Sequence, residues 1–198
     1  MTKERNFLIH PSYIVMFLIL AGVSALFLGF SAAYLYSRLD QNIPPVKLPS
    51  LFYYNTLLLI ASSATLQWAK KSYKADHTAN YKLALIITLA LTLTFLGAQI
   101  LAWQQLMASD IFVNYNNMAS YMYMISGIHF LHVVAGIPFL VMFIVNAVRK
   151  MKSPVSVLIY FSDIAKKRRL DLFNIYWHFL DGLWIYLVIF FLVNYLLQ

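Results

Sequence analysis

The sequence contains no cysteine, and this single absence removes several kinds of chemistry. Disulfides, thiolate nucleophiles, iron–sulfur clusters and thiolate-held copper all require cysteine side chains. Acidic residues are also scarce, since Asp and Glu together number 7 in 198 residues and Glu4 is the only glutamate. A diiron carboxylate site needs several glutamates, and a nucleophile triad needs an acid beside a base. The composition therefore argues against redox or hydrolytic catalysis by this chain alone.

Charged residues of both signs make up only 11% of the chain, whereas hydrophobic residues make up 62%, and the mean hydropathy is +0.70. Soluble globular domains have about 45–50% apolar and about 25% charged residues. The apolar residues form long continuous runs, unlike the short alternating segments of a transmembrane β-barrel. The composition argues against a soluble enzyme, a disordered tail and a coiled coil, and it predicts an all-α polytopic membrane protein.

Five apolar segments are long enough to cross a hydrocarbon core about 30 Å thick, which takes about 20 helical residues. We expect residues 1–198 to form a single domain of five transmembrane helices. The first connection contains Pro44, Pro45 and Pro49, where a helix must stop, and no segment has the pattern of a cleaved signal peptide. The predicted spans are approximately 13–37, 51–69, 83–107, 120–148 and 172–197.

The basic residues predict the orientation of these helices. Five spans place the N-terminus and the second and fourth connections on one side of the membrane, and only Arg38 and Lys47 lie on the other. Cytoplasmic segments carry an excess of Lys and Arg, so we expect a cytoplasmic N-terminus and a periplasmic C-terminus. Spread over loops at a membrane surface, these charges argue against nucleic acid as a partner. The 13 basic residues on the first side are Lys3, Arg5, Lys70, Lys71, Lys74, Lys82, Arg149, Lys150, Lys152, Lys166, Lys167, Arg168 and Arg169.

Few polar side chains lie inside the predicted spans, and ionisable residues there are functional candidates because burying them in lipid is costly. The fourth span contains His129 and His132, and the fifth contains His178 and Asp181. The members of each pair are three residues apart and so share a helix face. The third span contains the uncharged amide Gln99.

Histidines and a carboxylate are common metal ligands, but the predicted depths argue against one shared site. Measured from the predicted inner helix ends, His132 lies roughly 24 Å deep and His178 roughly 9 Å deep. The resulting separation of roughly 15 Å far exceeds a metal–ligand bond of about 2 Å. We therefore expect no metal or cofactor on this chain, and we expect His178 and Asp181 to form a charge-assisted pair near the cytoplasmic headgroups.

A run of small residues lies along one face of the first span, spaced three or four apart. Such a seam lets two helices approach closely. The sequence leaves open whether the seam packs inside the five-helix bundle or on a partner protein. The residues of the seam are Gly22, Ala25, Gly29 and Ala32.

Three further features concern the lipid-facing parts of the chain. Trp68, Trp103, Tyr176 and Trp177 lie near the expected helix ends, as interfacial anchors do. Pro138 removes a backbone hydrogen bond in the fourth span and predicts a bend that can leave a cleft. The connection 153–170 combines apolar clusters with four consecutive basic residues, so it either lies on the membrane surface and binds acidic headgroups or forms a solvated basic loop.

Two segments near the C-terminus carry a family pattern. The run SGIHFLHV at residues 126–133, followed by Gly136, resembles the G-x-H-x-x-H-V segment of haem–copper oxidase subunit III. The run YWHFLD at residues 176–181, followed by Trp184, resembles the Y-W-H-F-x-D signature of the same family. Weaker similarities, which extend the resemblance over essentially the whole chain, occur at Gly29, Ala33, Tyr34, Pro49, Asn55, Thr56, Ser62, Ser63, Trp68, Ala69 and Gln99.

The chain is similar to the short, five-helix members of this family, which lack the first two helices of the seven-helix members. The resemblance implies a non-catalytic subunit III of a proton-pumping respiratory terminal oxidase, which passes electrons from cytochrome c to O2 in the bacterial inner membrane. Such a subunit packs on the haem- and copper-bearing subunit I, with subunit II as a further partner, and binds phospholipid in a cleft between its helices. A larger respiratory supercomplex is a further assembly that the resemblance leaves open.

The resemblance also assigns roles to individual residues. It implies that His129, His132, His178 and Asp181 are structural or lie near lipid rather than act in catalysis. We expect the same structural or lipid-binding role for four further residues, Tyr176, Trp177, Trp184 and Gln99, and we expect the small residues of the first span to pack on a partner.

One departure from the family concerns proton chemistry. Many members carry a membrane-embedded glutamate in the helix that corresponds to the first span, and this position falls at about Val23 here. A proton-related role of that glutamate therefore does not carry over. Within the family, a quinol oxidase subunit III and an accessory protein of nitric oxide reductase are the alternatives, and a free-standing small transporter is the alternative from another class.

Overall fold

The computed structural model describes residues 10–151 and 153–197, and helices account for nearly all of this part of the chain, which contains no strand. The prediction of an all-α fold is confirmed. Part of the argument from charge relies on residues outside the described part of the chain, namely Lys3, Glu4, Arg5 and Lys152. The helices are α1 (Pro11–Gln41), α2 (Ser50–Lys74), α3 (Thr78–Met107), α4 (Asn117–Lys150), α5 (Pro154–Ser162) and α6 (Ile164–Leu196).

Local sequence signals begin several of these helices. The side chain of Asn116 accepts a hydrogen bond from the backbone N–H of Ala119 at 2.7 Å and so caps α4. Ser153 forms a capping box with Ser156 at the start of α5. Asp163 ends α5 and caps α6, because its carboxylate accepts from two backbone N–H groups in the first turn. Residues 153–163 therefore form a structured corner before α6.

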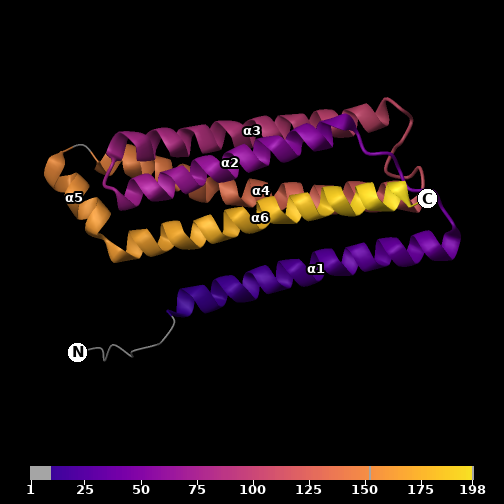
Figure 1. Ribbon diagram of the computed structural model, residues 1–198, viewed down its shortest axis with the longest axis horizontal. Coiled ribbons are helices and arrows are strands. Elements are labelled where there is room, and N and C mark those ends of the chain that lie inside the picture. The colour runs from indigo at the N-terminus through magenta and orange to yellow at the C-terminus, as the bar shows by residue number, and fades with distance from the viewer. Residues whose placement is uncertain (1–9, 152, 198) are drawn as a thin grey trace.

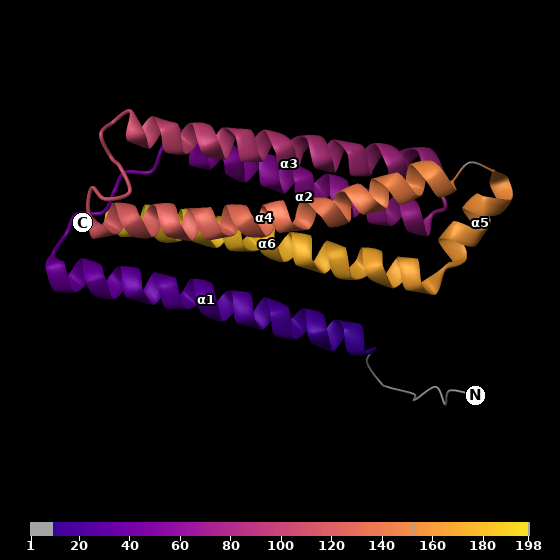
Figure 2. The same cartoon turned by 180° about the vertical axis from the view of Figure 1, so that it is seen from behind.

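The five long helices run along a common direction, and the short α5 crosses one end of the bundle (Figure 1). The antiparallel pair α2 and α3 lies on one side of α4 and α6, and α1 lies on the other side, as both views show (Figure 2). This order makes α4 and α6 the central layer. Side chains of α4 and α6 can therefore contact either α2 and α3 or α1.

The described Lys and Arg residues gather at the two ends of the bundle. Ten of the described Lys and Arg residues lie at the end that carries α5, where the C-termini of α2 and α4 meet the N-termini of α3 and α6. Arg38 and Lys47 lie at the opposite end. An ion pair of 2.9 Å between Lys70 and Asp171 joins α2 to α6 at the basic end. The long apolar surfaces between the two ends suit a bilayer.

In the described part of the chain, four helices are long and apolar enough to cross a membrane, namely α1, α3, α4 and α6. The remaining predicted span, 51–69, lies within α2, whose 25 residues are long enough but carry more polar side chains. Several of these polar side chains, including Asn55 and Ser62, are fully buried against neighbouring helices. The polarity of α2 is thus directed inward, while Tyr54, Leu57 and Ile60 are exposed.

The buried core divides into two clusters along the bundle. One surrounds Phe95 and Trp184, whose rings meet edge to face with centroids 5.3 Å apart. The other lies at the basic end and includes Tyr73, Tyr81 and Trp177. In α1 every buried residue lies at or after Phe27, so only the second half of this helix belongs to the core. This uneven packing of α1 positions the cleft described below.

Candidate functional site

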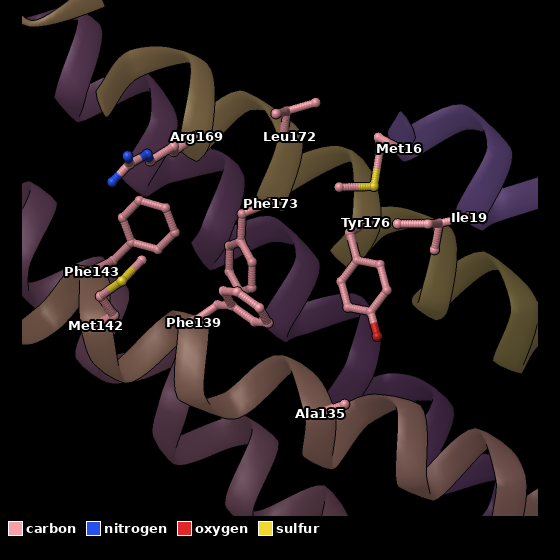
Figure 3. A pocket seen from close by; sticks show the side chains of 10 residues that line it. All are labelled: Met16, Ile19, Ala135, Phe139, Met142, Phe143, Arg169, Leu172, Phe173 and Tyr176. Atoms are coloured by element: carbon pink, nitrogen blue, oxygen red, sulfur yellow. The ribbon is translucent and has the colours of Figure 1, made fainter. Parts of the chain in front are cut away.

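An apolar cleft of about 510 Å³ lies between α1, α4 and α6 near the basic end of the bundle. Figure 3 shows its walls, with Arg169 at one end as the only charged side chain and Tyr176 turning its hydroxyl toward α4. The remaining lining residues are apolar: Met16, Ile19, Ala135, Phe139, Met142, Phe143, Leu172 and Phe173.

The cleft opens because α1 is packed at only one of its ends. In its second half, Tyr34 meets the rings of Phe190 and Phe191 edge to face with centroids 5.3 and 5.7 Å apart. The first half carries no buried residue and diverges from α4 and α6 (Figures 1 and 2). The helix α4 continues through Pro138 and changes direction about midway along its length (Figure 2). Proline has no N–H for the backbone ladder, which accounts for a bend here.

The cleft combines apolar walls with one cation, Arg169, at one end. Arg169 is exposed, and a guanidinium forms bidentate hydrogen bonds with phosphate or carboxylate. The Tyr176 hydroxyl is already used, because it donates to the backbone carbonyl of His132 at 2.9 Å. The cleft therefore suits an amphiphile that has an anionic head and an alkyl chain.

A second group of candidates lies on the other side of α4 and α6, where α2 supplies the hydrogen-bond partners. The indole of Trp177 donates to the Ser62 hydroxyl at 3.1 Å, and that of Trp184 donates to Thr56 at 3.2 Å. Asn55 donates from Nδ2 to Oε1 of Gln99 in α3 at 2.8 Å. These α2 residues were not among the predicted site residues. Residues 55 and 62, like residues 56 and 63, are seven apart and so lie along one helix face. This spacing of polar residues could have indicated from the sequence that α2 presents a polar face to its neighbouring helices.

The two histidines of α4 occupy different surroundings. His129 is fully buried between Trp184 and Phe95, with ring centroids 5.0 and 6.2 Å away, and neither ring nitrogen has a hydrogen-bond partner among the described residues. His132 is half-buried, faces the ring of Phe27 in α1 at 5.9 Å, and donates from Nδ1 to its own helix. Although they are three residues apart, the histidines thus turn toward different neighbouring helices.

The expected pairing of His178 with Asp181 is not found. His178 instead contacts the Ser63 hydroxyl through Nδ1, and Oδ2 of the buried Asp181 has no hydrogen-bond partner among the described residues. The reason is that Ser63 of α2 lies opposite this face of α6, so an interhelical contact replaces the one within the helix. Ser63 also neighbours Asp181.

The predicted depth difference between His132 and His178 is also wrong. Since α6 begins at Ile164 rather than near residue 172, His178 lies fourteen residues into its helix, or about 21 Å. His132 lies eighteen residues before Lys150, or about 27 Å from the same end. The two residues therefore differ by only about 6 Å in height. Within the described residues, no group of three or more His, Asp or Glu side chains is arranged to hold a metal ion.

The aromatic residues of α6 do not lie at a helix end as predicted. Trp177 is 1% exposed and belongs to the core, and Tyr176 lines the cleft. The same early start of α6 explains this difference, because it moves both residues toward the middle of the helix. Trp68 and Trp103 do lie in the last turns of α2 and α3.

The small-residue seam of α1 faces away from the rest of the bundle. All four of its residues are exposed, whereas the buried residues Phe27, Ser31 and Tyr34 lie on the opposite face. A β-carbon added to Gly22 or Gly29 would meet no atom within 4 Å. Of the two interpretations that the sequence left open, packing of the seam inside this bundle does not occur.

Residues 15–195 match the family model described as "Cytochrome c oxidase subunit III". The chain belongs to the cytochrome c oxidase subunit III family. The prediction of the family from the two C-terminal segments is therefore confirmed.

Curated relatives carry the same family name. Cytochrome c oxidase subunit 3 of Thermostichus vulcanus is 29% identical over 190 residues, covering 90% of this chain and 86% of the relative. That of Synechocystis sp. is 30% identical over 183 residues, covering 89% and 72% respectively. That of Yarrowia lipolytica is 30% identical over 153 residues, covering 76% of this chain but only 50% of the relative. The chain thus spans most of the first two proteins and about half of the third.

Proposed function

We propose that this chain is a non-catalytic subunit III of a bacterial respiratory oxidase that transfers electrons from cytochrome c to O2 and pumps protons. The match of residues 15–195 to the subunit III family carries this proposal. The sequence supports it, because a chain without cysteine and with one glutamate offers few ligands for a redox centre. Haem and copper are accordingly assigned to partner subunits, above all subunit I, with subunit II beside it.

The proposed membrane topology has five spans in one domain, with α2 as the fifth. At 1.5 Å per residue, its 25 residues extend about 37 Å, which exceeds a hydrocarbon core of about 30 Å. Its polar residues Asn55, Thr56 and Ser62 bond to side chains of α3 and α6, so their polarity is not exposed to lipid. The collection of Lys and Arg at the α5 end supports a cytoplasmic N-terminus and a periplasmic C-terminus in a bacterial plasma membrane.

The proposed contact with the oxidase is the outward seam of α1, formed by Gly22, Ala25, Gly29 and Ala32. Small residues let the backbones of two membrane helices come close enough for extensive van der Waals contact. The seam is exposed over about ten residues and has open space above its glycines. A transmembrane helix of subunit I is the proposed occupant of this surface.

The proposed ligand of the cleft is a phospholipid. An acyl chain would lie along Phe139, Met142 and Phe173, and the phosphate would pair with Arg169 at the cytoplasmic headgroup level. The lipid would then lie beside Tyr176, at the end of the bundle that carries the connection 153–170. The remaining predicted residues are proposed as structural: His129, His132, His178, Asp181, Trp177, Trp184 and Gln99.

Purification of the affinity-tagged chain from its own membranes in mild detergent tests the assignment. We expect a haem- and copper-containing complex that consumes O2 with reduced cytochrome c as donor. O2 consumption with quinol alone would assign the chain to a quinol oxidase, and nitric oxide reduction would assign it to a nitric oxide reductase. Isolation of the chain without any haem protein, together with solute transport by vesicles that contain it, would overturn the proposal in favour of a transporter.

A further inference from the structure

The short helix α5 presents a continuous apolar face to the outside of the protein. Val155, Leu158 and Ile159 are 68%, 66% and 64% exposed, and their spacing of three and four places them on one side of the helix. Ile164, at the start of α6, extends this face and is 77% exposed. A helix surface of this kind in contact with water alone would be unfavourable.

The opposite face of α5 is also apolar and is fixed to the bundle. Tyr160 and Phe161 are buried, the Tyr73 hydroxyl of α2 donates to the Tyr160 carbonyl at 3.0 Å, and the ring of Phe161 lies 5.0 Å from that of Tyr73. The ammonium of Lys166 lies 4.6 Å above the ring of Tyr160. These contacts determine which side of α5 faces inward, so the exposed apolar side points away from the protein.

Basic residues precede and follow α5 along the chain. Lys150 precedes α5, and Lys167 and Arg168 follow it in the first turns of α6. The neighbouring acid, Asp163, is already paired with Lys166 at 2.9 Å, and neither Lys167 nor Arg168 makes an ion pair with any described residue. The surface therefore combines a strip of aliphatic side chains with uncompensated positive charge.

We infer that α5 is an interfacial anchor that inserts Val155, Leu158 and Ile159 among the acyl chains of one leaflet, while Lys167 and Arg168 bind the phosphates of anionic phospholipids. The favoured occupant is a lipid surface, because aliphatic side chains beside basic residues match the two layers of a leaflet. The position of α5 at the basic end of the bundle, across the ends of the long helices, supports this assignment (Figure 1). The inference rests on the proposed function only in requiring that the long helices cross a bilayer.

Spin labelling tests this inference directly, because the chain has no cysteine of its own. The variant Ile159→Cys is labelled in the intact complex in phosphatidylcholine vesicles with and without phosphatidylglycerol, and the unsubstituted complex corrects for labelling of partner subunits. Lys71→Cys, exposed at the same end on α2, is the aqueous control, and Ile100→Cys, exposed on the apolar helix α3 seven residues before its last residue, is the lipid control. Leu158→Cys reports on the same face if Ile159→Cys does not assemble.

We expect the spin label at residue 159 to collide more often with O2 than with a water-soluble nickel chelate. The label at residue 100 should show the same preference for O2, and the label at residue 71 should show the opposite preference. Phosphatidylglycerol should increase the preference for O2 at residue 159, and the double variant Lys167→Gln with Arg168→Gln should remove the increase. Nickel accessibility equal to that of residue 71 would overturn the inference, as would a label shielded from both reagents by a partner subunit. If the label lies in lipid but the chain purifies without a haem protein, the inference that α5 is an interfacial anchor is supported and the proposed function is rejected.

Discussion

Gly136 of α4 lies directly against the indole of Trp177 in α6, since a β-carbon at residue 136 would come 2.8 Å from Cζ3 of Trp177. This contact brings two helices of the central layer together next to the cleft. The indole cannot move away freely, because it is buried and its Nε1 bonds to Ser62 of α2. Gly136 thus allows α4 to pack closely against Trp177, which in turn bonds to α2.

Replacing Gly136 by alanine is expected to destabilise the protein by about 1–3 kcal/mol, the usual cost of overpacking a well-packed core. Gly127→Ala in the same helix is the matched control, because its β-carbon would meet no atom within 4 Å. Alanine is the better helix former by up to about 1 kcal/mol, so this control should be neutral or stabilising. Thermal unfolding of the purified complex, followed by circular dichroism, measures both. Equal effects of the two variants would contradict the close contact at Trp177.

Replacing Ser62 by alanine removes the hydrogen-bond acceptor of the Trp177 indole. The expected loss of stability lies between about 0.6 kcal/mol, the mean for hydrogen bonds between membrane helices, and about 3 kcal/mol for a buried donor left unpaired. Ser24→Ala is the control, because among the described residues the Ser24 hydroxyl bonds only to the Leu20 carbonyl of its own helix, α1. Both variants can be compared by thermal unfolding, and a control as destabilised as Ser62→Ala would argue against a special role of the interhelical bond.

Filling the seam of α1 should weaken assembly without unfolding the chain. Gly29→Leu adds a side chain where the structure has open space, so the isolated fold should tolerate it, whereas a closely packed partner helix should not. We expect a several-fold lower recovery of haem protein with the tagged chain. Gly97→Leu, at an exposed glycine of α3 that also has open space, is the control and should leave recovery unchanged. Normal recovery with Gly29→Leu would place the partner elsewhere.

Removing the cation of the cleft should release a bound phospholipid. Arg169→Gln keeps a polar side chain of similar length but loses the charge that pairs with phosphate. Native mass spectrometry of the intact complex should show fewer retained phospholipids per complex. Lys71→Gln removes an exposed charge at the same end of the bundle, away from the cleft, and should have no effect. If both variants retain the same lipids as the unsubstituted complex, Arg169 does not bind a headgroup.

Acid should loosen the corner between α5 and α6. The pKa of Asp163 is lowered from its usual 3.8 by hydrogen bonds from Lys166 and from the backbone of Ala165. A carboxylate with a lowered pKa stabilises the fold fully above the usual value and loses this contribution as the pH falls through its folded-state pKa. Hydrogen exchange near residue 163, corrected for intrinsic rates, should therefore rise below about pH 3.8. Asp163→Asn can still cap α6 but does not titrate there, so it should remove this pH dependence.

Much of the fold followed from the sequence because hydropathy and charge act locally. Long apolar runs without cysteine and with few acids predicted an all-α membrane protein, and the charge distribution predicted the two ends of the bundle. The two motifs of α4 and α6 predicted the family. Helix ends were less predictable. The basic run 166–169 continues α6 beyond the apolar stretch, because a helix does not need to end where its apolar residues do.

Only the tertiary structure decided which residues meet. Ser63 rather than Asp181 became the partner of His178, and Ser62 and Thr56 became the acceptors of Trp177 and Trp184, because α2 packs against this face of α6. The outward turn of the small-residue seam and the cleft beneath the first half of α1 have the same origin. A sequence specifies which face of a helix is apolar, small or polar, whereas the neighbour that each face receives depends on the packing of all helices together.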